Sequence, residues 1–186
     1  MIATEVTSPF LTPFKLSLVL AVFVAMPVIL AQVWGFIAPG LYKSERRIAV
    51  PLLASSVVLF YGGVAFAYYV VFPLLFGFFT TVGPGDIAVM TDINRYLDFV
   101  LKLFFAFGLA FEVPVAAVIL ILSGVVTADQ LANNRSYVIV GCFVMGMLLT
   151  PPDVISQTLL ALPMWLLFEV GLIMGRVLSR GNLDDE

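Results

Sequence analysis

Two acidic residues stand where the surrounding sequence makes a carboxylate costly or unexpected. Glu112 lies in the apolar stretch FGLAFEVPV, and Glu45 lies among cations in FIAPGLYKSERRIAV. A carboxylate inside a bilayer is costly unless it pairs, protonates or faces the protein interior. A carboxylate at the membrane surface can accept a bidentate pair of hydrogen bonds from a guanidinium, which lysine cannot imitate. Glu112 is therefore a candidate intramembrane site, and Glu45 is a candidate receptor for an arginine.

Two interpretations of Glu45 stay open at this point. It can be a solvated acid paired with Lys43 or Arg46, and such an exposed pair contributes little to stability. It can instead be a receptor carboxylate for a basic, partly apolar peptide. The adjacent apolar surface would come from Phe36, Leu41 and Tyr42.

Glu112 has four possible roles: a polar contact between helices, a proton site, a polar defect that thins the membrane, and a docking point for a partner. Pro114 follows two residues later and leaves a backbone carbonyl about one turn back without its usual donor. A protonated Glu112 could donate a hydrogen bond near that carbonyl. Function is the default interpretation of an acid at such a position.

The third candidate is the stretch TPPDVISQ, residues 150–157, which joins two apolar runs. Pro151 and Pro152 break the first run, and Asp153 is a good N-cap for the helix that follows. Gln157 lies one turn beyond the cap, where a membrane helix of a partner could hydrogen-bond to its amide. Farther on, Gly171 and Gly175 have the spacing of a helix-packing contact.

Composition excludes several classes of protein. The chain has 186 residues, is 62% hydrophobic and only 11% charged, and has a mean hydropathy of +1.12. It is therefore an integral membrane protein. It contains no histidine and one cysteine, Cys142, so we expect no metal site. No phosphate-binding glycine loop occurs, and we expect no cofactor and no nucleic-acid partner.

The apolar runs predict an all-α bundle of five transmembrane helices within a single domain. The expected spans are residues 14–38, 48–79, 96–126, 136–150 and 154–174, the last two short, followed by a tail at 175–186. Pro27 should kink the first span, and Gly62-Gly63 and Pro73 offer bends in the second. An alternative is that residues 136–175 form a re-entrant helical pair.

The positive residues predict the orientation of the bundle. Five spans place the loop at 39–47, the loop at 127–135 and the C-terminal tail on one side. Six of the nine basic residues lie there, and the other three are Lys15, Arg95 and Lys102. The C-terminus should therefore be cytoplasmic and the N-terminus outside.

These stretches together resemble the TatC family, the multi-spanning subunit of the twin-arginine protein translocase. The resemblance rests on four segments that cover nearly the whole chain: SPFLTPFK (8–15), QVWGFIAPGLYKSERR (32–47), AFGLAFEVPV (106–115) and RSYVIVGCFVMGMLLTPPDVISQTLLALPMWLLFE (135–169). It implies the TatC fold, with these five helices equivalent to spans two to six, in the bacterial cytoplasmic membrane. The family's N-terminal tail and first span have no counterpart here. The chain would then be a fragment, the product of a mis-called start, or a real variant.

The resemblance also implies roles. The family exports folded proteins that carry twin-arginine signal peptides, using the proton-motive force and without covalent catalysis. Glu45 would receive the twin-arginine motif, with Phe36, Leu41 and Lys43 nearby, and Glu112 would be the buried membrane glutamate. Single-span TatA- and TatB-type partners would dock at Met147, Thr150 and Gln157, and further TatC copies are expected partners. The alternative function is a small proton-coupled transporter using Glu112, but the chain shows none of the internal repeats typical of transporters.

Overall fold

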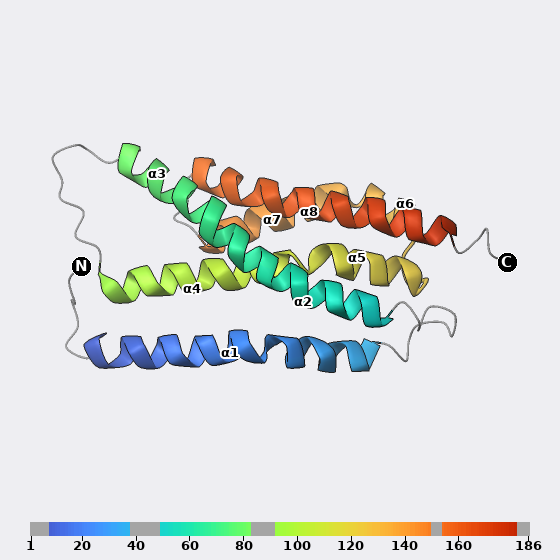
Figure 1. The fold of residues 1–186 in the computed structure, drawn as a ribbon. Helices are drawn as coiled ribbons and strands as arrows, with labels where there is room; N and C mark the ends of the chain where they lie inside the picture. The colour runs from blue at the N-terminus through green and yellow to red at the C-terminus, as the bar shows by residue number, and fades with distance from the viewer. Residues whose placement is uncertain (1–7, 38–48, 83–91, 150–153, 182–186) are drawn as a thin grey trace.

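The computed structural model describes residues 8–37, 49–82, 92–149 and 154–181. Every regular element in these ranges is a helix. Figure 1 shows helices that run back and forth along one long axis, with the start of α1 and the end of α8 at opposite ends. The elements are α1 (Ser8–Ile37), α2 (Ala49–Phe66), the π-helical turn η3 (Ala67–Val71), α3 (Phe72–Val82), α4 (Ile93–Ala110), α5 (Val113–Leu122), α6 (Ala128–Asn133), α7 (Arg135–Leu149) and α8 (Val154–Gly181).

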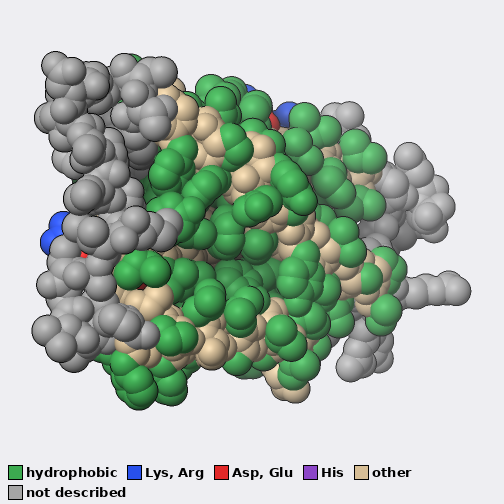
Figure 2. Space-filling view, turned by 60° about the vertical axis from the view of Figure 1, so that its left-hand side comes forward, with side chains coloured by type: hydrophobic (Ala, Val, Ile, Leu, Met, Phe, Trp, Pro, Cys, Tyr) green, Lys and Arg blue, Asp and Glu red, His purple; other side chains and the backbone are tan. Residues whose placement is uncertain are grey.

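The outside of the bundle is apolar. Within the described residues, four stretches are long and apolar enough to cross a bilayer: Phe10–Phe36, Val50–Phe78, Ile93–Leu122 and Val154–Ser179. The face in Figure 2 consists mainly of hydrophobic side chains. Val24 and Tyr137, for example, are 76% and 79% exposed. Such a surface suits lipid rather than water, and the predicted all-α membrane protein is confirmed.

The second span is one long helix that widens before Pro73. Proline has no N–H, so it cannot supply the regular hydrogen bond at its position. Immediately before it, the N–H of Phe72 donates to the carbonyl of Ala67, five residues back, and the turn Ala67–Val71 is π-helical. The irregularity therefore lies next to Pro73, which is one of the places where the sequence predicts a bend.

The third span differs from the sequence prediction, because residues 96–126 do not form one continuous helix. Helix α4 ends at Ala110 and α5 begins at Val113. The Asp92 carboxylate caps α4 by accepting from the backbone N–H of Asn94 at 2.8 Å and of Arg95 at 3.4 Å. A further short helix, α6, begins at a capping box made by Thr127 and Gln130.

The last two helices differ in length, although both were expected to be short. Helix α7 has 15 residues, about 22 Å, which is less than a hydrocarbon core of roughly 30 Å. Helix α8 has 28 residues and continues past Met174 to Gly181, so it is long enough to cross alone. Figure 1 shows α7 ending and α8 beginning well short of the level at which α1 and α4 begin.

Glycines permit the closest approaches between helices. A Cβ on Gly63 of α2 would lie 2.4 Å from the carbonyl oxygen of Phe107 on α4. A Cβ on Gly171 of α8 would lie 2.5 Å from Cα of Pro114 on α5, and one on Gly175 would meet the side chain of Ile121. The predicted packing role of Gly171 and Gly175 is thus confirmed. Gly63 serves contact with α4, a role that the sequence did not suggest.

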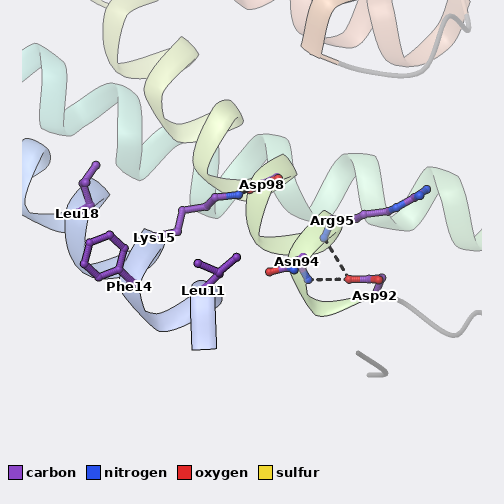
Figure 3. Close-up of a pocket in the computed structure, with 8 residues that line it drawn as sticks. All are labelled: Leu11, Phe14, Lys15, Leu18, Asp92, Asn94, Arg95 and Asp98. Atoms are coloured by element: carbon purple, nitrogen blue, oxygen red, sulfur yellow. Dashed lines mark hydrogen bonds and ion pairs between the residues drawn. The ribbon is translucent and has the colours of Figure 1, made fainter. Parts of the chain in front are cut away.

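Polar groups join α1 to α4 at the end where both begin. Lys15 Nζ lies 2.6 Å from Asp98 Oδ1, and the Thr12 hydroxyl donates to the Asn94 side-chain oxygen. Figure 3 shows Lys15 reaching from α1 toward Asp98, whereas the Arg95 side chain points away from this pair. These contacts set the position of α1 along α4.

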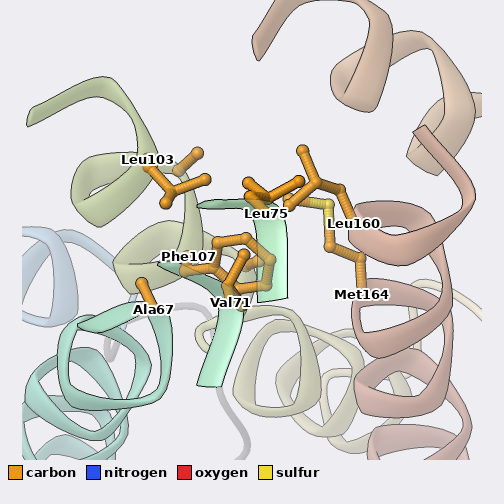
Figure 4. Close-up of a cluster of buried hydrophobic side chains, with 9 residues drawn as sticks. Ala67, Val71, Leu75, Leu103, Phe107, Leu160 and Met164 are labelled. Atoms are coloured by element: carbon orange, nitrogen blue, oxygen red, sulfur yellow. The ribbon is translucent and has the colours of Figure 1, made fainter. Parts of the chain in front are cut away.

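The largest buried cluster lies where η3, α3, α4 and α8 meet (Figure 4). Phe107, Leu75 and Leu160 are completely buried. Phe107 lies one and a half turns before Glu112, so this cluster fixes the end of α4 from which the acid projects. The remaining labelled members are Ala67, Val71, Leu103 and Met164.

Candidate functional site

Much of the predicted receptor site lies outside the described residues. Glu45, Leu41 and Lys43 belong to residues 38–48, and Phe36 is the member that the structure describes. Phe36 is in the last turn of α1 and is 86% exposed. The end of α1 and the start of α2 lie at the same end of the bundle as the end of α8 (Figure 1). The receptor role of Glu45 stays a prediction.

Glu112 lies in the two-residue break between α4 and α5. The Phe111 N–H donates to Phe107 at 3.0 Å, but the Glu112 N–H donates to Leu109, only three residues back, also at 3.0 Å. Pro114 occupies the first turn of α5, where a missing N–H costs little. The backbone therefore changes helix at Glu112, and its carbonyl accepts from Ala116 at 2.9 Å as α5 begins.

The carboxyl group of Glu112 is partly buried against α2. Its Oε1 atom is buried and has no hydrogen-bond partner among the described residues. Ser56, which is 1% exposed on α2, is the polar side chain that interacts with this carboxyl group. The Ser56 hydroxyl also accepts a hydrogen bond from Nε1 of Trp34 at 3.2 Å. Because Trp34 is 5% exposed, three separate chain segments meet in one buried polar group.

Trp34 and Ser56 were not among the predicted site residues. They are 22 positions apart, and nothing in the sequence indicates that these two residues pair. A serine in an apolar helix is common and usually bonds to its own backbone. Ser55 does so, since its hydroxyl donates to the carbonyl of Leu52 at 2.7 Å. Only the packing of α1 against α2 distinguishes Ser56 from Ser55.

The predicted docking cluster is partly described. Met147 on α7 is 50% exposed, which suits a contact surface. Gln157 on α8 donates from Nε2 to the carbonyl of Phe143 on α7 at 2.8 Å. A primary amide has two N–H donors and one carbonyl acceptor, so an external helix would have to use the remaining ones. Thr150, Pro151, Pro152 and Asp153 lie outside the described residues.

Two ion pairs connect α8 to the helices before it. Arg135 and Glu169 form a two-pronged pair, with Nε–Oε1 and Nη2–Oε2 distances of 2.8 Å. Arg176 Nη2 lies 3.0 Å from Oδ1 of Asp129 on α6. Glu169, which the sequence places near the end of a span, thus has a partner within the chain.

The overall sequence and fold identify the family. A family model described as "Sec-independent protein translocase protein (TatC)" matches residues 1–163. The chain belongs to the TatC family. The TatC protein of Azotobacter chroococcum mcd 1 is 69% identical over 175 residues, which cover 94% of this chain and 69% of that protein. The TatC protein of Escherichia coli strain K12 is 59% identical over 176 residues, covering 95% and 68%.

Solved TatC structures share this fold. A crystal structure described as the twin arginine translocase receptor TatC superposes with a TM-score of 0.86 at 40% identity, covering 96% of this chain and 79% of that one. The same receptor in the detergent DDM gives 0.85 at 41% identity, covering 94% and 78%. The chain is thus a multi-span membrane protein of a Sec-independent translocase. The family match favours this interpretation over the alternative, a small proton-coupled transporter.

Proposed function

We propose that this TatC chain recognises twin-arginine signal peptides and holds single-span partner subunits while folded proteins are exported. The observation that carries the proposal is the match over residues 1–163 together with the superposition on a twin arginine translocase receptor. Export would draw on the proton-motive force. The chain would lie in the bacterial cytoplasmic membrane with its C-terminus in the cytoplasm.

The receptor role falls to Glu45, with Phe36, Leu41 and Lys43 beside it. A carboxylate matches the two parallel N–H groups of a guanidinium. The exposed Phe36 ring at the end of α1 supplies apolar surface next to residues 38–48. A signal peptide combines basic and apolar residues, so a carboxylate beside an apolar ring suits it.

The scaffold role falls to the region around α7 and the start of α8. Met147 exposes half of its side chain there, and Gln157 keeps unused hydrogen-bonding capacity after its bond to Phe143. In a bilayer, packing and interhelical hydrogen bonds, not the hydrophobic effect, drive helix association. TatA- and TatB-type helices and further TatC copies are the proposed partners.

The receptor role is tested by photo-crosslinking a precursor, with the reactive group next to its twin arginines, to membranes containing the chain. Glu45→Gln should reduce the yield about tenfold or more, because a hydrogen bond to a charged group contributes roughly 1.5–3 kcal/mol. The matched control is Asp129→Asn, which removes an exposed carboxylate at the same end of the bundle. A precursor with paired lysines should give low yields with every variant. Equal yields from Glu45→Gln and the unaltered chain would refute the role of Glu45.

A further inference from the structure

A groove of about 560 Å³ runs along α4 between α1 and α7. Its walls come from three helices that are far apart in sequence. Apart from its polar groups, it is lined mainly by Val19, Leu101, Phe105, Leu109, Met145 and Leu149. Leu109 and Met145 are 45% and 44% exposed, so the groove is accessible from the membrane.

The polar groups of the groove gather toward the beginning of α4. They are Lys15, Asp98 and Lys102. Lys15 and Asp98 neutralise each other across 2.6 Å. The ion pairs within the described part of the chain do not include Lys102, whose side chain is exposed. The three charged side chains that line this end therefore sum to one positive charge, counted over the described residues.

The position of Lys102 calls for an anion. It lies nine residues after Ile93, which places its Cα about 14 Å along α4. A lysine at such depth extends its apolar stem toward the membrane surface and keeps its ammonium with polar groups. Here that direction leads to the Lys15–Asp98 pair, where an incoming anion would meet two ammonium groups and one carboxylate.

The length of the groove matches one leaflet. From Asp98 to Leu109 the helix rises about 16 Å, close to half of a hydrocarbon core of roughly 30 Å. The charged end lies toward the membrane surface and the apolar walls extend inward. This is the order of groups in a phospholipid: a phosphate followed by an acyl chain.

We propose that the groove binds an anionic phospholipid, with its phosphate at Lys102 beside Lys15 and one acyl chain along Leu101, Phe105 and Leu109. This single net positive charge complements the single negative charge of a phosphatidylglycerol headgroup. The lipid would fill the space that the described residues leave open between α1 and α7.

Native mass spectrometry of the detergent-purified chain tests the headgroup contact with three probes. Dioleoyl phosphatidylglycerol should bind, whereas dioleoylglycerol, which lacks the phosphate, and glycerol phosphate, which lacks the acyl chains, should not. Lys102→Gln should weaken binding about tenfold, as expected for the loss of one charge-assisted contact, and Lys102→Arg should retain it. The control is Arg95→Gln, because that side chain points away from the Lys15–Asp98 pair (Figure 3). Equal binding of dioleoylglycerol, competition by glycerol phosphate or unchanged binding in Lys102→Gln would overturn the proposal.

Photo-crosslinking in bacterial membranes identifies the occupant directly. Benzoylphenylalanine at Leu109 should give an adduct with the mass of an anionic phospholipid, and Lys102→Gln should strongly reduce its yield. The same group at Val140, which is 61% exposed on α7 and does not line the groove, should react with bulk lipid independently of Lys102. An adduct from Leu109 to a polypeptide would show that a helix occupies the groove and would refute the lipid assignment.

Discussion

Ser56 is the residue through which α1 and α2 reach the carboxyl group of Glu112. Its replacement by alanine leaves the buried Nε1–H of Trp34 without an acceptor, which costs about 1–3 kcal/mol. We expect Ser56→Ala to lower the thermal midpoint of the purified chain by several degrees. Ser55→Ala, which removes only a bond to the same helix, should have little effect. Differential scanning fluorimetry of both variants makes the comparison, and equal losses would contradict the special role of Ser56.

Two substitutions distinguish a role of Glu112 as a polar group from a role in proton chemistry. If a polar group at this depth suffices, Glu112→Gln should retain much more export than Glu112→Ala, because glutamine can still bond with Ser56 but cannot ionise. Export of a twin-arginine reporter measures the difference. Equal loss in both variants would instead favour proton chemistry at this position.

Sequence reasoning found the unusual residues but not all their partners. Glu112 was identifiable because an acid in an apolar run is rare, and Gly171 and Gly175 were identifiable by spacing. Trp34 and Ser56 were not, because hydrogen bonds between distant segments depend on how helices pack. The Arg135–Glu169 ion pair was not predicted for the same reason.

At the scale of helices, the contact between α5 and α8 is the most sensitive to side-chain size. A Cβ on Gly171 would meet the backbone of Pro114, at 2.5 Å from Cα and 3.0 Å from the carbonyl oxygen. Backbone cannot move aside as a flexible side chain can, so Gly171→Ala should destabilise the chain by about 1–3 kcal/mol. Gly141→Ala, on α7 with nothing within 4 Å of the added carbon, should be neutral or stabilising. In detergent-resistance assays, Gly171→Ala should therefore reduce the resistance of the chain, whereas Gly141→Ala should leave it unchanged or raise it.

Hydropathy predicted the presence of the helices better than their continuity. Pro114 marks one missing hydrogen bond, but a proline can also lie within a continuous helix, as Pro27 does in α1, so the sequence did not predict that the helix breaks between Ala110 and Val113. The extension of α8 was missed because charged residues lower hydropathy after Met174. In the folded chain Arg176 pairs with Asp129, and the helix continues beyond the apolar run.

For the whole molecule, the arrangement in Figure 1 places α6 and the end of α8 at one end and the start of α4 at the other. The positive residues predict that the first end is cytoplasmic. In a chain with Cys142 replaced by alanine, a membrane-impermeant maleimide should label Arg95→Cys in intact spheroplasts and should label Asp129→Cys only after lysis. Both positions are exposed, so access and not burial decides the result. The reverse pattern would invert the proposed topology.

The π-helical turn at Ala67–Val71 acts like a single-residue insertion in an otherwise regular helix. Each residue of an α-helix turns the chain by about 100°, so an extra residue in a regular helix would rotate everything after it, but the bond from Phe72 to Ala67 closes a wider turn that accommodates the extra residue and keeps the phase. Deleting Tyr69, whose side chain is 75% exposed, would let α2 and α3 join as one uniform helix. Leu75 would then keep its place in the cluster with Phe107 and Leu160, because the residue removed is the one that the wide turn accommodates. The wide turn thus lets this helix carry one extra residue on its outer face while Ala67, Val71 and Leu75 stay buried on its inner face.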